Sequence, residues 1–250
     1  MCNLSLYPGP PNSDLDFGIA YPSCSSFEIT SNNFPWLTEN IVILCFDVNR
    51  MDSCFSYDGE LNSIANSNST HWQAGLAKYK NKLITVGGYH LEGSNSGRTE
   101  QMERMKNGTF IWSVVAHRFS SAQDHSLVTV PPSDMNEEFV LLIGGTVTAY
   151  DQSGNFGAFH DIVLKFNGTW SYFGMLKKRR KYHSSIYWNG AVYVIGGIHG
   201  NLDENRKVKM EVWKIHDSPN EFNTSENWPE LFDWFKPHLF IVEDAFFPDY

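Results

Sequence analysis

The side chains best suited to chemistry lie in three segments that each follow a pair of adjacent glycines. They combine aromatic rings with imidazoles and a carboxylate, a mixture that suits the recognition of a protein or a sugar. The alternative is that these side chains only pack the loops against one another. The candidate binding residues are Tyr89, His90, Tyr150, Asp151, Phe156, His160 and His199.

The nine histidines form no metal-ligand motif along the chain. No two of them are spaced as His-x-His or His-x-x-x-His, and no Cys-x-x-Cys occurs, so we expect neither a metal nor another cofactor. Segment 151–155 alternates oxygen-bearing side chains as a calcium loop does, but it lacks the closing glutamate. We interpret this segment as a polar turn.

The motifs of common catalytic sites are also missing. The chain has no Gly-x-Ser-x-Gly nucleophile elbow and no phosphate-binding glycine loop. We interpret the scattered carboxylates Glu100, Glu103 and Asp161 as exposed strand or loop residues rather than as acids or bases in catalysis. The sequence therefore predicts a protein that is not an enzyme.

The elements that must position the candidate residues are three apolar runs, at 83–86, 140–143 and 191–195, that each end in a glycine pair. The pairs are Gly87-Gly88, Gly144-Gly145 and Gly196-Gly197. The first glycines of successive pairs are 57 and 52 residues apart, which is about the period of one propeller blade with long loops.

Each glycine pair is flanked by the same predicted strands. Asn189-Gly190 predicts a hairpin turn between strands at 182–188 and 191–195, and a third strand is expected at 207–215. Equivalent strands are expected at 99–106, 109–116, 161–166 and 169–175, with loops at 89–97, 146–160 and 198–206. These units predict four-stranded antiparallel meanders whose loops emerge on one face. The large rings of three tryptophans on these strands should cover the seams between sheets: Trp112, Trp170 and Trp213.

This order of features resembles the kelch repeat, best over 167–197, where the matching residues are Trp170, Met175, Arg180, Tyr193 and the glycine pair. The resemblance implies an all-β fold, a β-propeller of four-stranded antiparallel kelch-like blades, with about five blades or alternatively six. Two further units lack the glycines. One spans 40–59, where Cys45-Phe46 replaces the pair, and the other includes 237–242. We expect a poorly defined segment at 1–26 and the propeller at 27–250, with 27–30 as the strand that closes the ring.

Charge and hydropathy limit the partners. The formal net charge of −9 disfavours nucleic acid, and no apolar stretch is long enough to span a membrane. The N-terminus does not look like a secretion signal, so the protein is either cytosolic or a piece of a longer chain. One basic run opposes the overall charge and is either a solvated loop or a patch for an acidic partner. Its residues are Lys177, Lys178, Arg179, Arg180 and Lys181.

The cysteines and glycosylation motifs bear on the cellular compartment. Cys45 and Cys54 fall in two predicted strands, 41–46 and 53–57, that a turn could fold into a hairpin, so they are either a disulfide or two buried thiols. Five Asn-x-Ser/Thr motifs begin at Asn3, Asn68, Asn107, Asn167 and Asn223. Together these features favour an extracellular location over a cytoplasmic one.

The kelch resemblance implies a non-catalytic module for protein–protein interaction, with an unidentified protein as its partner and one loop face as its binding surface. A secreted glycan-binding or adhesive ectodomain is the first alternative. The second is an enzyme on the same scaffold, an oxidase or a sugar-processing enzyme, although the residues of the kelch-like copper oxidases have no match in this chain.

Overall fold

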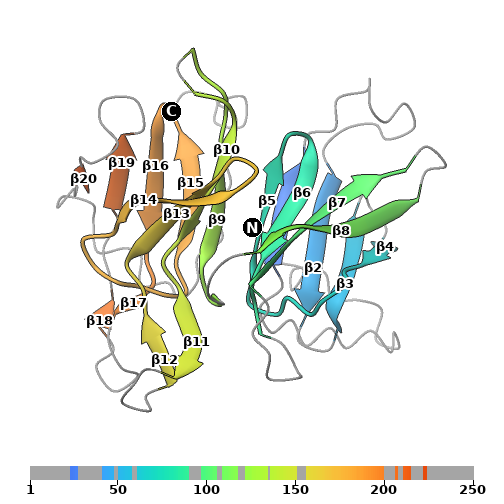
Figure 1. Ribbon diagram of the computed structural model, residues 1–250, viewed down its shortest axis with the longest axis horizontal. Coiled ribbons are helices and arrows are strands. Elements are labelled where there is room, and N and C mark those ends of the chain that lie inside the picture. Colours follow the sequence, from blue (N-terminus) through green and yellow to red (C-terminus); the bar gives the residue numbers. More distant parts are fainter. Residues whose placement is uncertain are drawn as a thin grey trace, which may run out of the picture.

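The computed structural model describes residues 23–27, 41–47, 50–57, 61–89, 97–105, 109–117, 122–134, 136–150, 156–199, 206–207, 211–214 and 222–223. These residues form β-strands connected by turns and loops, and they include no helix, which confirms the all-β prediction. Figure 1 shows four antiparallel sheets of four strands standing side by side.

The strands of each sheet follow one another in chain order, so each sheet is a meander. Sheet 1 contains β1 (Ser23–Phe27), β2 (Ile41–Asp47), β3 (Arg50–Tyr57) and β4 (Leu61–Asn66). Sheet 2 contains β5 (Gly75–Tyr79), β6 (Lys82–Val86), β7 (Arg98–Arg104) and β8 (Phe110–His117). Sheet 3 contains β9 (Ser126–Val130), β10 (Phe139–Ile143), β13 (Ile162–Phe166) and β14 (Trp170–Met175). Sheet 4 contains β15 (Ser184–Trp188), β16 (Ala191–Ile195), β19 (Glu211–Lys214) and β20 (Phe222–Asn223).

Two short hairpins extend from sheets 3 and 4 where sequence reasoning placed only loops. The first pairs β11 (Thr146–Tyr150) with β12 (Phe156–Phe159), and the second pairs β17 (Ile198–His199) with β18 (Arg206–Lys207). The predictions of loops over 146–160 and 198–206 were therefore wrong. The third strand of sheet 4 begins at Glu211 rather than 207.

The first strands of successive sheets lie next to each other, as they do around the axis of a β-propeller. β1 contacts β5, β5 contacts β9, and β9 contacts β15. The closure of a ring and the number of blades remain predictions. The strand that closes the ring was expected to begin at Phe27, whereas β1 ends there. Apart from Phe27, β1 lies in segment 1–26, which was expected to be poorly defined. The expected strand at 237–242 lies outside the described residues.

The apolar runs are continuous because the central strands are buried on both faces. In β6, Leu83 packs in the cluster between sheets 1 and 2, whereas its neighbour Ile84 packs in the cluster between sheets 2 and 3. In β10, Val140 faces sheet 2 and Leu141 faces sheet 4. Alternate residues of one strand thus supply two different cores, which lie between successive sheets.

Tryptophan covers two of these seams, as the sequence predicted. Trp112 on β8 is buried beside Phe46 of sheet 1, with ring centroids 5.9 Å apart. Trp170 on β14 packs against Phe166 and donates a 2.7 Å hydrogen bond from Nε1 to the Thr99 hydroxyl of sheet 2. Each ring therefore ties an outer strand to the adjacent sheet. The side chain of Trp213 lies outside the described part of the chain.

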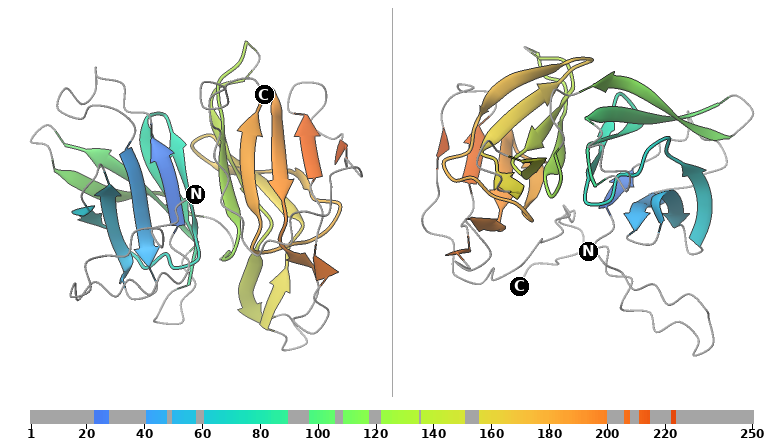
Figure 2. Two further views of the ribbon diagram at one scale, coloured as in Figure 1. Left: turned by 180° about the vertical axis from the view of Figure 1, so that it is seen from behind. Right: turned by 60° about the horizontal axis from the view of Figure 1, so that its bottom comes forward.

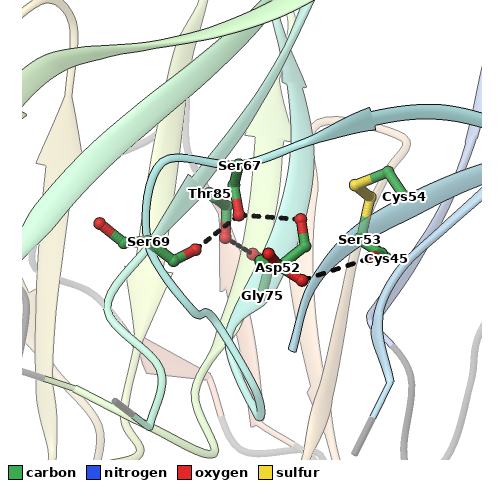
Figure 3. Close-up of a disulfide and its surroundings, with 8 residues drawn as sticks. All are labelled: Cys45, Asp52, Ser53, Cys54, Ser67, Ser69, Gly75 and Thr85. Atoms are coloured by element: carbon green, nitrogen blue, oxygen red, sulfur yellow. Dashed lines mark hydrogen bonds between the residues drawn. A yellow bond between two sulfur atoms is a disulfide. The ribbon is translucent and has the colours of Figure 1, made fainter. Parts of the chain in front are cut away.

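A disulfide joins Cys45 on β2 to Cys54 on β3 and confirms one of the two alternatives for this pair. Both residues are buried in the cluster between sheets 1 and 2. Figure 3 shows the bridge beside a hydroxyl network in which Ser67 Oγ donates to the Asp52 and Ser69 carbonyls, at 3.1 and 2.5 Å. The disulfide links two strands of sheet 1, and the hydroxyl network holds β3 against the segment that leads into sheet 2.

We expect removal of this disulfide, as Cys45→Ala with Cys54→Ala, to lower the free energy of unfolding. The bridge spans nine residues, and a loop of this size stabilises by about 2 to 3 kcal/mol through the unfolded chain. Urea unfolding with and without a reductant measures the effect. Reductant should lower the stability of the wild type towards that of the variant and leave the variant unchanged, and equal sensitivity in both would contradict the prediction.

Candidate functional site

The glycine pairs lie at the ends of β6, β10 and β16, where the chain leaves the sheets. All six glycines have positive φ, between 56 and 93°. Each pair sits beside a short segment that leads into the first strand of a sheet. We call these the lead-in segments, 71–73 for sheet 2, 122–124 for sheet 3 and 180–182 for sheet 4.

Space at the pairs is too small for a side chain. A Cβ on Gly88 would lie 2.6 Å from the His71 carbonyl carbon, and one on Gly145 would lie 2.6 Å from the Gln123 carbonyl oxygen. The same glycines donate hydrogen bonds from their backbone N–H groups to the lead-in segment of the next sheet, to Ala122 O at 2.7 Å and Arg180 O at 2.9 Å. The first two glycine pairs therefore each connect the lead-in segments of two successive sheets.

The lead-in segments also bond to one another. Asp124 donates from its backbone N–H to Gln73 O at 2.8 Å, and Tyr182 donates to Asp124 O at 3.1 Å. These three residues occupy equivalent positions and all have positive φ, at 63, 57 and 55°. Such angles are uncommon outside glycine, so their repetition marks a backbone ladder from sheet to sheet. We call the surface formed by the glycine pairs and lead-in segments the glycine-pair face.

The two short hairpins project from this face and are anchored to it by backbone hydrogen bonds (Figures 1 and 2). At the base of β11–β12, Thr146 and Gln123 exchange two backbone hydrogen bonds, of 2.8 and 3.0 Å, and His160 donates to Gly145 O at 2.8 Å. Lys181 and Ile198 form the same reciprocal pair at the base of β17. The hairpins are thus extensions of a rigid backbone platform.

The half-buried side chains of the face include aromatic, basic and amide groups. Trp72 and Tyr89 form an edge-to-face pair with centroids 5.7 Å apart, and both are half-buried. The Lys181 ammonium lies 4.7 Å from the centre of the Tyr182 ring. His199 Nδ1 lies 2.9 Å from Arg179 O and donates to it, because a carbonyl oxygen can only accept. Half-exposed rings with polar edges can bind a partner while the backbone stays fixed.

The candidate binding residues that the structure describes share this location. Tyr89 follows the first glycine pair. Tyr150 and Phe156 are backbone partners across the β11–β12 hairpin. His160 and His199 lie at or near the bases of the hairpins. His90 and Asp151 lie outside the described residues. The sequence did not single out Trp72, Gln73 and Tyr182. Their only signal is positional, since each lies just before the first strand of a sheet in the structure, at Gly75 or at Ser184.

The basic run does not form one exposed patch. Lys177, Lys178 and Arg179 are exposed and Lys181 is half-buried, but Arg180 is only 1% exposed. The Arg180 guanidinium donates from Nη1 to Gly196 O at 3.0 Å. Arg180 therefore holds the third glycine pair in place, and at most the other four residues are available to an acidic partner.

His71 takes the same role in sheet 2. It lies 16 residues before Gly87, as Arg180 lies 16 residues before Gly196, and its Nδ1 donates to Gly87 O at 2.7 Å. Its Nε2 lies 3.3 Å from Glu100 Oε1, and both side chains are fully buried. The prediction of Glu100 as an exposed carboxylate was wrong. The shared 16-residue spacing was the signal that could have identified His71.

Further hydrogen bonds surround the Glu100 carboxylate. The Asn68 backbone N–H and side-chain Nδ2 donate to Oε2, at 2.9 and 3.1 Å. Burial alone raises the pKa of Glu100, but the hydrogen bond and charge of His71, with hydrogen bonds from Asn68 and Ser69, outweigh it and hold the pKa below its usual value. The carboxylate is therefore charged at neutral pH, with Oε2 hydrogen-bonded to Asn68 and Oε1 beside His71 Nε2.

Two further features are not found among the described residues. Among the described residues, no three His, Cys, Asp or Glu side chains come together as a metal-binding group. The described part of the chain also contains no helix that could cross a membrane.

Comparison with known proteins gives a fold and no family. No family model and no curated protein matches this chain. A solved structure of YjhT is similar, with a TM-score of 0.55 and 16% sequence identity, over 69% of this chain and 51% of that one. This chain thus matches about half of the length of YjhT. At this identity the similarity concerns the fold alone, and it supports the propeller-like arrangement of the sheets.

Proposed function

We propose that this protein is a kelch-type β-propeller that acts as a non-catalytic protein-interaction module and binds its partner through the glycine-pair face. The repeated glycine pairs, the four meander sheets and the backbone ladder between sheets support the kelch assignment. The observation on which the function rests is the pair of hairpins, β11–β12 and β17–β18, which project side by side from a backbone platform that carries the half-exposed rings of Trp72 and Tyr89.

The platform suits binding because its geometry is held without the partner. Reciprocal backbone hydrogen bonds anchor each hairpin base, so little order has to be gained when a partner binds. Aromatic side chains are the residues that most often dominate the energy of protein interfaces. The buried acid of this region, Glu100, is closed off from solvent and lies 3.3 Å from His71 Nε2, which favours a structural role for it over a catalytic one.

A pair of matched variants tests this proposal. Tyr150→Thr with Phe156→Thr replaces the two aromatic residues that pair across the β11–β12 hairpin and keeps residues that favour a strand. Trp188→Thr removes a ring that is 54% exposed and lies just before the β15–β16 turn, at the end of sheet 4 opposite to its glycine pair. Each protein is immobilised, and bound proteins from cells and medium of the source tissue are quantified by mass spectrometry.

We expect at least one protein to bind the wild type and the Trp188→Thr control equally and to bind the hairpin variant about tenfold less or weaker still, as for loss of an interface hot spot. The thermal midpoints of the three proteins should agree, which excludes unfolding as the cause. The proposal fails if every captured protein binds the hairpin variant as well as the wild type.

We further propose that the module works outside the cell, as the secreted ectodomain considered from the sequence. The supporting observation is the buried Cys45–Cys54 disulfide, because such bridges persist in oxidising compartments and are rare in the cytosol. Alkylation of the native protein without reductant, followed by peptide mapping, tests this setting. Alkylated Cys45 and Cys54 in native material would contradict it.

A further inference from the structure

The turn between β13 and β14 is open to solvent on all sides. It consists of Asn167, Gly168 and Thr169, all exposed. Asn167 donates its backbone N–H to Thr169 O at 3.4 Å. Gly168 has a φ of 108°, and a Cβ added to it would meet no atom within 4 Å. The side chains of Asn167 and Thr169 therefore have room for a large group beside them.

These three residues form an Asn-x-Thr sequon, and Asn68-Ser69-Thr70 forms another in the described part of the chain. The two differ in what the asparagine amide does. Asn68 Nδ2 donates to Glu100 Oε2 at 3.1 Å and to Trp112 O at 2.9 Å, which uses both of its hydrogens. Ser69 is buried, and the Thr70 hydroxyl donates to Tyr89 O at 3.2 Å.

A sugar on Asn68 would thus replace a hydrogen that the fold uses, whereas a sugar on Asn167 would not. Glycosylation often precedes folding, so the fold acts here as a selection. Asn68 is itself exposed, but a chain modified there loses one of the two hydrogen bonds that its amide makes to Glu100 and Trp112. The folded protein should therefore bear a glycan at Asn167 and none at Asn68.

The Asn167 turn is also remote from the glycine-pair face within its sheet. Phe166 pairs with Val140 near the start of β10, while Gly144 follows the other end of that strand. The turn and the glycine pair thus lie at opposite ends of sheet 3. A glycan on Asn167 would cover the far end of the sheet and leave the hairpins accessible.

We propose that Asn167 is an N-glycosylation site of the folded protein, an inference that rests on the extracellular setting proposed above. The donor is an oligosaccharide carried on a lipid pyrophosphate. Asn167 Nδ2 forms a bond to C1 of the first sugar, the bond from C1 to the pyrophosphate oxygen breaks, and one amide proton is released. Nothing is oxidised or reduced in this transfer.

Peptide mapping of the protein from its native source, and of the full chain directed through the secretory pathway of cultured animal cells, tests the site. Release of glycans by an amidase in water enriched in heavy oxygen converts a glycosylated asparagine to labelled aspartate. We expect the label at Asn167 in most molecules and at Asn68 in almost none. Asn167→Gln and Thr169→Ala should each remove the mass of one glycan, and the Asn68→Gln control should remove none.

The state of the cysteines, read in the same maps, separates two kinds of failure. An unmodified Asn167 in protein with an intact Cys45–Cys54 disulfide overturns the glycosylation site and leaves the extracellular setting in place. An unmodified Asn167 with free Cys45 and Cys54 in native material overturns both. Equal labelling of Asn68 and Asn167 in folded protein overturns the selection by the fold.

Discussion

The Gly88→Ala variant is expected to lose about 3 kcal/mol of its free energy of unfolding, from about 1 to 2 kcal/mol of left-handed backbone strain and a similar amount from overpacking. Gly88 has a φ of 87°, and the added Cβ would lie 2.6 and 2.8 Å from the carbonyl carbon and Cα of His71. Both are backbone atoms, so no side chain can rotate away to make space. The variant must shift either β6 or the lead-in segment of sheet 2.

Gly168→Ala is the matched control for this prediction. Gly168 also has a positive φ, 108°, but a Cβ at this position would have no atom within 4 Å, so only backbone strain of about 1 to 2 kcal/mol applies. Urea unfolding of both variants measures the difference, which isolates the close contact at the glycine pair. Equal losses of stability in the two variants would mean that Gly88 is required for its backbone angle alone. The lead-in segment would then move away from the added Cβ at no energetic cost.

The glycine pairs made much of the fold predictable because their requirement is local. A strand that must end in a positive φ beside another backbone has to be followed by glycine, whatever the distant contacts are. The predicted strand at 191–195 accordingly matches β16, and the prediction for β6 differs by one residue. Sheet 1 shows the exception, since Phe46, the second residue of the Cys45-Phe46 pair that was expected to replace the glycines, adopts a φ of 64° without being glycine.

The β11–β12 hairpin had a local signal in the sequence, but the repeat pattern led us to expect a loop at this position. The run Thr146, Val147 and Thr148 is β-branched and favours a strand, yet it lies where a blade of this type was expected to have a loop. Its partner strand β12 begins ten residues after Thr146. The pairing of two such short strands depends on the anchoring bonds from Gln123 and Gly145, which no short window of the sequence contains.

The buried polar groups of the face could not be predicted from local sequence for the same reason. Glu100 lies on an ordinary amphipathic strand, and its burial follows from His71, 29 residues away, and from Asn68, 32 residues away. Arg180 lies within a basic run whose other members are exposed or half-buried. Their partners are backbone carbonyls and side chains brought together by sheet packing, so only the spacing between equivalent positions reveals them.

We expect Glu100→Gln to lower the free energy of unfolding by about 3 to 5 kcal/mol, the usual effect of removing one partner from a buried ion pair. His71 Nδ1 donates to Gly87 O, and its Nε2 lies 3.3 Å from Glu100 Oε1. A glutamine amide cannot match the charge of the carboxylate that His71 and Asn68 surround. The loss should loosen the seam between sheets 1 and 2 and the first glycine pair with it.

Glu103→Gln on the same strand is the control for this substitution. Its carboxylate pairs with Lys82 Nζ at 2.6 Å, and both side chains are more than one-third exposed. A solvent-exposed ion pair of this kind contributes about 0 to 1 kcal/mol, so this variant should remain close to the wild type. If both substitutions cost the same, the burial of the Glu100–His71 pair has no energetic consequence.

The pH dependence of the Glu100→Gln effect provides an independent check of its cause. Because His71, Asn68 and Ser69 hold the pKa of Glu100 below its usual value in the folded state, the charged carboxylate stabilises the fold fully above the unfolded-state pKa of about 4.3. This contribution is lost as the pH falls through the lower, folded-state pKa, where the carboxylate becomes protonated. The difference in unfolding free energy between wild type and variant should therefore shrink as the pH falls below about 4.3, the carboxyl pKa of the unfolded chain. A difference that stays constant into strong acid would show that the carboxylate's shape, rather than its charge, holds His71 in place.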